Sequence, residues 1–185
     1  MRTPGLSAIG GTIRVGELAP NSKDIAHALK FEFFGAAWYY GARQLQPATK
    51  TNKGRTQYYW PATGSDDDSV ARNGKPPGYN GSYPSVAPGA LLALPPRVAS
   101  GLTVHHPIAR KFRNALMNYG AYLVDSSSGY ANKVSICMAQ GVNTELQSHY
   151  NISMAFPHGI APTGHGAQLY TELLLLLRNL HTVTN

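Results

Sequence analysis

The chain has 185 residues, and its charged fraction of 14% lies well below the roughly 25% of an ordinary soluble domain. The hydrophobic fraction of 43% excludes a disordered protein, and the single cysteine excludes an internal disulfide scaffold and a multi-cysteine zinc site. The net charge of +7 reflects scarce acids rather than a basic tail, because 9 acidic residues stand against 16 basic ones. We therefore expect a loop-rich globular protein with a single domain over residues 1–185.

The first half of the chain is predicted to contain several strands joined by long loops. Residues 9–18 read as a strand interrupted by glycines, 57–60 as a strand that a proline ends, and 90–94 as a short apolar strand followed by two prolines. Residues 41–56 and 61–88 are rich in Gly, Pro, Ser, Asn and Asp, a composition typical of loops.

Residues 27–34 show the clearest alternation in the sequence. Leu29 and Phe31 would point to one face, whereas Lys30 and Glu32 would point to the other. This pattern predicts a half-buried strand, and a helix that begins at a polar residue upstream is the alternative.

The second half of the chain is predicted to combine two helices with two strands. Residues 107–118 carry apolar side chains at helical spacing behind a first-turn proline, and 167–181 carry a stripe of leucines. Residues 122–125 and 133–139 read as strands. The pattern predicts an α+β protein, mainly β with two or three helices. We expect a single β-sandwich or jelly-roll-like domain on which the C-terminal helix packs.

Several function classes lack their motifs. The glycine spacing of nucleotide-binding loops and the Gly-x-Ser-x-Gly motif are absent, and the seven histidines lack the spacing of a metal site. The longest apolar run, 173–177, is too short for a membrane span, and no nucleic-acid motif accompanies the basic clusters at 50–55 and 110–113. We expect no cofactor, metal, nucleic-acid partner or membrane span, an inert buried thiol at Cys137, and solvated basic clusters.

Polar residues within the predicted strands suggest acid–base chemistry on a sugar. Glu17 and Asp125 are isolated acids in β segments, and a pair of carboxylates that flanks a sugar can hydrolyse a glycosidic bond. His27 would act as a base or orient the acid. Arg14 and Lys30 would contact a substrate carboxylate, an arrangement that would suit a polysaccharide lyase. The structural alternative is that Arg14 and Glu17 form an ion pair and that His27 is a core histidine.

Aromatic residues add a binding component to this hypothesis. Trp60 and Tyr119 are predicted to contact substrate. Tyr58, Tyr59, Tyr79 and Tyr83 are suited to stacking on sugar rings if they are exposed. Two sequons, at Asn80 and Asn151, are candidate N-glycosylation sites.

Six blocks of the sequence resemble, in order, a poorly characterised family of secreted, β-rich bacterial proteins. The blocks are GLSAIGGTIRVGEL (5–18), IAHALK (25–30), YWPA (59–62), LLALPP (91–96), ALMNYGAYLVD (115–125) and LHTV (180–183). The resemblance implies an extracellular location and a role beside carbohydrate-active modules. Family members have a further N-terminal region with a signal peptide. The chain begins at the first block without a signal peptide, so we expect it to be a C-terminal portion. Residues 126–166 match the family weakly.

Together these features predict a secreted protein that acts on an extracellular polysaccharide as a glycoside hydrolase or polysaccharide lyase. The alternative is a non-catalytic module that binds glycans or assembles into an extracellular structure, in which low charge and exposed strand edges drive association.

Overall fold

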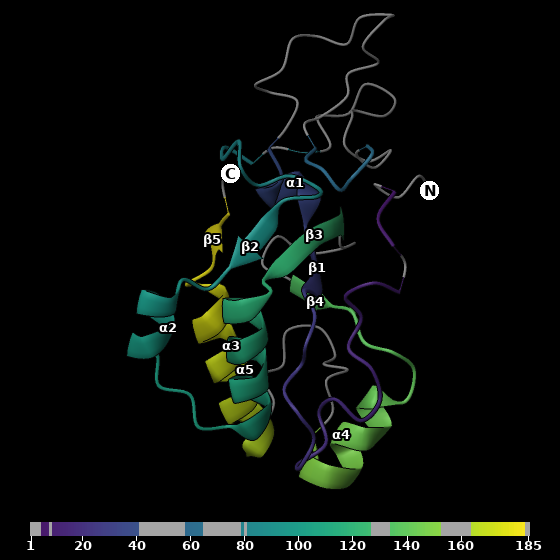
Figure 1. Cartoon of the computed structure of the whole chain (residues 1–185), viewed down its shortest axis with the longest axis vertical. Coiled ribbons are helices and arrows are strands. Elements are labelled where there is room, and N and C mark those ends of the chain that lie inside the picture. The colour runs from purple at the N-terminus through teal and green to yellow at the C-terminus, as the bar shows by residue number, and fades with distance from the viewer. Residues whose placement is uncertain are drawn as a thin grey trace, which may run out of the picture.

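The computed structural model places one mixed sheet above a group of helices (Figure 1). It describes residues 5–7, 9–40, 58–64, 79, 81–126, 134–152 and 164–183. The helices are α1 Gly35–Trp38, α2 Pro96–Gly101, α3 Pro107–Asn118, α4 Val142–Tyr150 and α5 His165–Leu177. The strands are β1 Leu29–Phe33, β2 Leu91–Ala93, β3 Ala121–Ser126, β4 Val134–Ile136 and β5 His181–Thr182.

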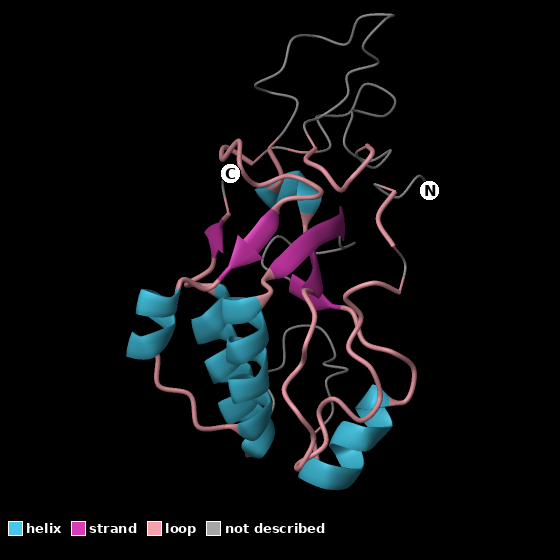
Figure 2. Cartoon of the chain, viewed as in Figure 1, coloured by secondary structure: helices cyan, strands magenta, loops and turns pink. Residues whose placement is uncertain are grey.

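The five strands form a single sheet in the order β4-β1-β3-β2-β5. Strands β1 and β3 run parallel, and the other neighbouring pairs are antiparallel. Helices α2, α3 and α5 gather below one side of the sheet, whereas α4 lies apart from them (Figure 2). The expected α+β fold is confirmed, but the expectation of a mainly β protein with two or three helices is wrong, because the described residues form five helices and more of them are helical than extended. The expected β-sandwich or jelly roll is not confirmed, because the strands of the described residues belong to one sheet.

Strand β1 confirms the alternation read from the sequence. Leu29 and Phe31 are fully buried on the face that meets α3, and Lys30 and Glu32 lie on the opposite face. The register with β3 shifts between Phe31 and Glu32, so β3 contains one extra residue at this point.

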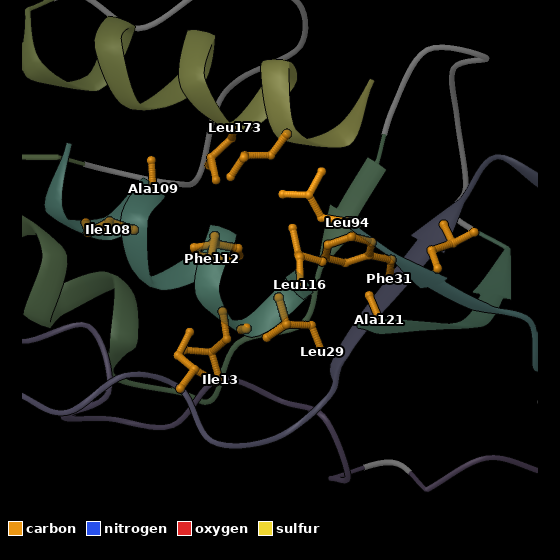
Figure 3. Packing of buried hydrophobic residues seen from close by; sticks show 14 of the residues in the cluster. Ile13, Leu29, Phe31, Leu94, Ile108, Ala109, Phe112, Leu116, Ala121 and Leu173 are labelled. Carbon is orange, nitrogen blue, oxygen red and sulfur yellow. The ribbon is translucent and has the colours of Figure 1, made fainter. Parts of the chain in front are cut away.

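Helix α3 supplies the centre of the hydrophobic core. Its apolar stripe packs against β1 on one side and against the leucines of α5 on the other, as Figure 3 shows for Phe112, Leu116 and Leu173. The core residues labelled there are Ile13, Leu29, Phe31, Leu94, Ile108, Ala109, Phe112, Leu116, Ala121 and Leu173. The predictions of strands 90–94 and 122–125 and of helix 107–118 are confirmed by β2, β3 and α3.

The basic cluster at 110–113 is not wholly solvated, contrary to the prediction. Lys111 is buried, and its Nζ donates to the backbone oxygens of Ser22 and Lys23, both at 2.7 Å, and to Ser22 Oγ at 2.9 Å. These three acceptors compensate the cost of burying an ammonium group. Lys111 therefore ties α3 to the loop before β1.

The predicted strand at 9–18 is wrong. This segment forms successive turns, and only Ile13 forms a β-bridge, with Met138. Gly11 and Gly16 have φ angles of +77° and +92°, which no regular strand accommodates. The predicted strand at 57–60 is also wrong for its described part, since residues 58–60 are not in a strand and a turn covers residues 59–62.

The remaining elements depart from prediction in their extent. Strand β4 covers the middle of the predicted strand 133–139. Helix α5 begins two residues before the predicted start at 167 and ends at Leu177, after which β5 joins the edge of the sheet. The short helices α1, α2 and α4 were not predicted. Within the described ranges, no helix has the length and apolar character needed to cross a membrane.

Gly120 follows the end of α3, and it offers a test of the helix–strand junction. Its φ is +73°, and a Cβ there would lie 2.6 Å from the backbone oxygen of Leu92. Gly16 also has a positive φ but no atom within 4 Å of its Cβ position. We expect Gly120→Ala to lower the free energy of unfolding by about 1 kcal/mol or more beyond the loss in Gly16→Ala, because only Gly120→Ala adds a clash to the backbone strain. Urea denaturation measures both, and equal losses would contradict the clash.

Candidate functional site

Glu17 and His27 form a contact that the sequence had marked as a candidate acid–base pair. His27 Nε2 lies 3.2 Å from both carboxylate oxygens of Glu17, and His27 Nδ1 lies 2.9 Å from the backbone oxygen of Ala28. Both side chains are about one-fifth exposed. The pair therefore lies near the surface and fixes the segment that precedes β1.

The turn around Glu17 is also bound by a second carboxylate. Glu17 Oε2 accepts the backbone N–H of Arg14 at 2.7 Å, and Glu145 Oε2 of α4 accepts that of Gly16 at 2.5 Å. Arg14 thus reaches Glu17 through its backbone, in place of the ion pair that the structural alternative assumed. The carboxylates of Glu17 and Glu145 thus accept hydrogen bonds from the Arg14 and Gly16 N–H groups of this turn, which do not pair with another strand.

Asp125 lies at the other end of the sheet from Glu17. It is the register partner of Glu32, near the end of β1, whereas His27 precedes the beginning of β1. The three steps from Leu29 to Glu32 alone span about 10 Å. The carboxylates of glycoside hydrolases stand about 5 to 9.5 Å apart. The structure therefore does not bring Glu17 and Asp125 together as such a pair.

A polar group that the sequence reasoning missed lies on the face of the sheet opposite α3. Cys137 Sγ donates to Glu32 Oε1 at 3.5 Å, and the buried Lys30 is close enough to act on the thiol. Burial first, and then the charge of Glu32, raise the pKa of Cys137 to about 11. The thiol stays protonated at neutral pH, which agrees with its expected inertness, and the burial of Lys30 does not suit contact with a substrate.

Four large aromatic side chains are exposed at the end of α1 and in the described loops between α1 and β2. Their exposed fractions are 86% for Trp60, 68% for Tyr83, 47% for Trp38 and 38% for Tyr58. We call these four residues the aromatic surface. Tyr79, which was predicted to stack on sugars, is instead buried.

Hydrogen bonds join the end of α1 and the two loop segments that carry the aromatic surface. Tyr59 donates through its hydroxyl to the backbone oxygen of Pro84 and through its N–H to that of Pro88, both at 2.8 Å. The N–H of Gly81 donates to the oxygen of Tyr39, and the N–H of Tyr40 donates to that of Val86, both at 2.7 Å. The aromatic surface therefore has a fixed backbone beneath it.

The other predicted site residues lie at different distances from this surface. Tyr119 follows α3 at the beginning of β3, while Asp125 and the aromatic surface lie toward the end of β3. Asn151 ends α4 with an exposed side chain that accepts from Gln147 at 2.7 Å. Asn80 is outside the described residues.

Neither metal-ligating residues within the described part of the chain nor known relatives add to the description of the site. In the part of the chain that the structure describes, His, Cys, Asp and Glu side chains do not gather in groups of three that could hold a metal ion. Comparisons with protein-family models, with curated proteins and with solved structures gave no match for this chain.

The raised pKa of Cys137 predicts slow alkylation of the native protein. With a pKa of about 11, roughly a thousandth of the thiol is ionised at pH 8, against about a quarter of an unperturbed cysteine. We expect iodoacetamide to react roughly two-hundredfold more slowly with native than with urea-unfolded protein at this pH, in proportion to the ionised fractions. Because the chain has one cysteine, mass spectrometry reports on Cys137 alone.

The same assay tests the cause of the shift. Glu32→Gln removes the charge that raises the pKa, so the pH at which alkylation accelerates should fall, while Glu145→Gln should leave it unchanged. Native reactivity with a midpoint near pH 8.5 would contradict the described environment.

Proposed function

We propose that the protein is a non-catalytic, extracellular module that binds a polysaccharide through the aromatic surface. The observation that carries this proposal is the exposure of two tryptophans and two tyrosines at the end of α1 and on two loop segments that hydrogen bonds hold together. The resemblance to secreted proteins found beside carbohydrate-active modules motivates both the extracellular setting and the choice of ligand.

The chemistry of sugars suits such a surface. A pyranose ring has an apolar C–H face and a rim of hydroxyl groups, and a flat aromatic ring can cover the apolar face while the rim stays hydrated. A large aromatic side chain buries 150 to 250 Å², and each Å² of apolar area removed from water contributes roughly 25 cal/mol. Tryptophan and tyrosine lose little conformational entropy on binding, because each has only two side-chain torsions.

The placement of the carboxylates favours binding over hydrolysis. Glu17 already accepts from Arg14 and contacts His27, and Asp125 Oδ1 accepts the backbone N–H of Ser126 at 2.8 Å. The two acids lie toward opposite ends of β1, so a hydrolase or lyase that uses both has no geometric support. The predicted catalytic roles therefore give way to the alternative of a glycan-binding module.

The aromatic surface predicts which substitutions weaken binding. We expect Trp60→Ala and Tyr83→Ala each to weaken binding to a soluble polysaccharide by about ten- to thirtyfold, since central aromatic contacts contribute about 1.4 to 2 kcal/mol. Affinity electrophoresis through gels that contain xylan, mixed-linkage glucan, alginate or pectin measures this loss for neutral and acidic polymers in one format.

Matched variants distinguish glycan binding from enzymatic activity and from self-association. Tyr119→Ala removes an exposed tyrosine outside the aromatic surface and should leave binding unchanged, as should Glu17→Gln and Asp125→Asn. Release of reducing or unsaturated ends that these two acid variants abolish would instead establish an enzyme. Retardation by no polymer, together with a dimer or larger assembly that Trp60→Ala dissociates in size-exclusion chromatography, would assign the aromatic surface to self-association.

A further inference from the structure

Helix α3 begins at a buried histidine whose ring serves as the cap. His106 is 4% exposed, and its Nδ1 accepts the backbone N–H of Ile108 at 3.2 Å. Ser, Thr, Asp and Asn usually fill this position, and their side-chain oxygens accept such a bond at any neutral pH. A histidine does so only while Nδ1 carries a lone pair, so the ring proton must be on Nε2.

The same helix start is held by a carboxylate of α5. Glu172 is buried, and its Oε2 accepts the backbone N–H groups of His105 and His106 at 3.1 and 2.9 Å. Its Oε1 accepts from Gln168 at 2.9 Å. Three of the roughly four acceptor positions of the carboxylate are therefore in use, which leaves little capacity for a charged histidine ring.

Other titratable groups surround the His106 ring from α4 and α5. His165 of α5 acts on it electrostatically, and Tyr150 of α4 has its ring centroid 5.8 Å away. The Tyr150 hydroxyl donates to the backbone oxygen of Leu18 at 2.9 Å, so it is not turned toward the histidine. Within α3, Arg110 directs its Nε to the backbone oxygen of Val104 at 3.2 Å. His106 therefore lies between the start of α3, Glu172 of α5 and Tyr150 of α4.

We propose that His106 is an acid-sensitive latch, in which proton uptake at Nδ1 breaks the cap of α3 and loosens the contacts of α3 with α5 and of the His106 ring with Tyr150. Protonation turns Nδ1 from an acceptor into a donor that faces the N–H of Ile108. Two donors then oppose each other in a buried site, and the first turn of α3 must open to relieve the conflict. The device is independent of the glycan-binding proposal.

The pKa directions give the pH window of the latch. Burial lowers the pKa of His106 below its ordinary value of 6.5, with His165 acting in the same direction and Glu172 against it. As the pH falls below 6.5, the unfolded chain binds a proton that the native protein resists, so stability falls. For Glu172, burial acts to raise the pKa, but the bonds from Gln168, His106 and His105 lower it overall, so its loss of stability begins only below about pH 4.5. A loss between pH 7.5 and 5.5 therefore reports on histidine rather than on Glu172.

His106→Asn tests the latch, because asparagine caps a helix well and does not titrate. For the wild-type chain, we expect the urea midpoint to fall between pH 7.5 and 5.5. We also expect the protection of the Ile108 amide against hydrogen exchange, corrected for the intrinsic rate, to drop about tenfold. His106→Asn should abolish both changes, while His105→Asn, at the exposed neighbouring histidine, should retain them.

The outcomes distinguish a latch from a merely structural cap. Equal pH dependence in wild type and His106→Asn, or Ile108 protection that stays constant, would overturn the proposal. If His106→Asn fails to fold, the imidazole resonances of His106 in the wild-type protein decide instead. Titration below 6.5, in step with loss of Ile108 protection, supports the latch, and titration at or above 6.5 overturns it.

Discussion

The packing of α3 between the sheet and α5 is the interaction on which the rest of the molecule depends. Phe112 and Leu116 bury their side chains against β1 on one side and the leucines of α5 on the other. Each such side chain contributes about 1.5 to 3 kcal/mol by leaving water. Polar contacts then fix the position of the helix: Lys111 binds the loop before β1, and Glu172 binds the two residues before the helix. The burial of apolar side chains thus provides the stability, and these polar contacts fix the positions of the loop before β1 and of the residues before α3.

Three of the acidic side chains share a structural role. Glu17, Glu145 and Glu172 all use a carboxylate oxygen to accept backbone N–H groups that lack a partner in regular structure. Charge-assisted bonds of this kind are stronger than neutral ones, so they suit a chain with many turns and few strands. A large share of the 9 acidic residues thus holds the fold together. The positive net charge follows from composition.

Periodicity predicted the elements that bury one face, and it failed where stability comes from contacts distant in sequence. The alternation of Leu29 and Phe31 with Lys30, and the helical spacing behind Pro107, each reflect a local pattern that the fold keeps. The 9–18 segment alternates as well, but its positive-φ glycines and the carboxylate of Glu145 hold it in turns. Helix α4 escaped prediction because only Val142 and Leu146 are buried within it, too few for a recognisable stripe. The sequence was sufficient to select Glu17, His27 and Asp125 as candidate site residues. Their separation along β1 depends on the register between β1 and β3, which a local sequence pattern does not contain.

The aromatic residues show most clearly how the same residue type serves opposite purposes. Tyr39 and Tyr79 pack edge to face with centroids 4.9 Å apart, and the Tyr39 hydroxyl donates to the backbone oxygen of Asp125 at 2.6 Å. These buried rings anchor the loops above the sheet, because moving either one would expose a large apolar area and break a hydrogen bond. Trp60 remains 86% exposed on a neighbouring loop and contributes almost none of that burial energy. A tryptophan that the loop keeps out of the core can still gain the free energy of burial when a partner covers it. This is the physical reason to look for the function of the protein at the aromatic surface.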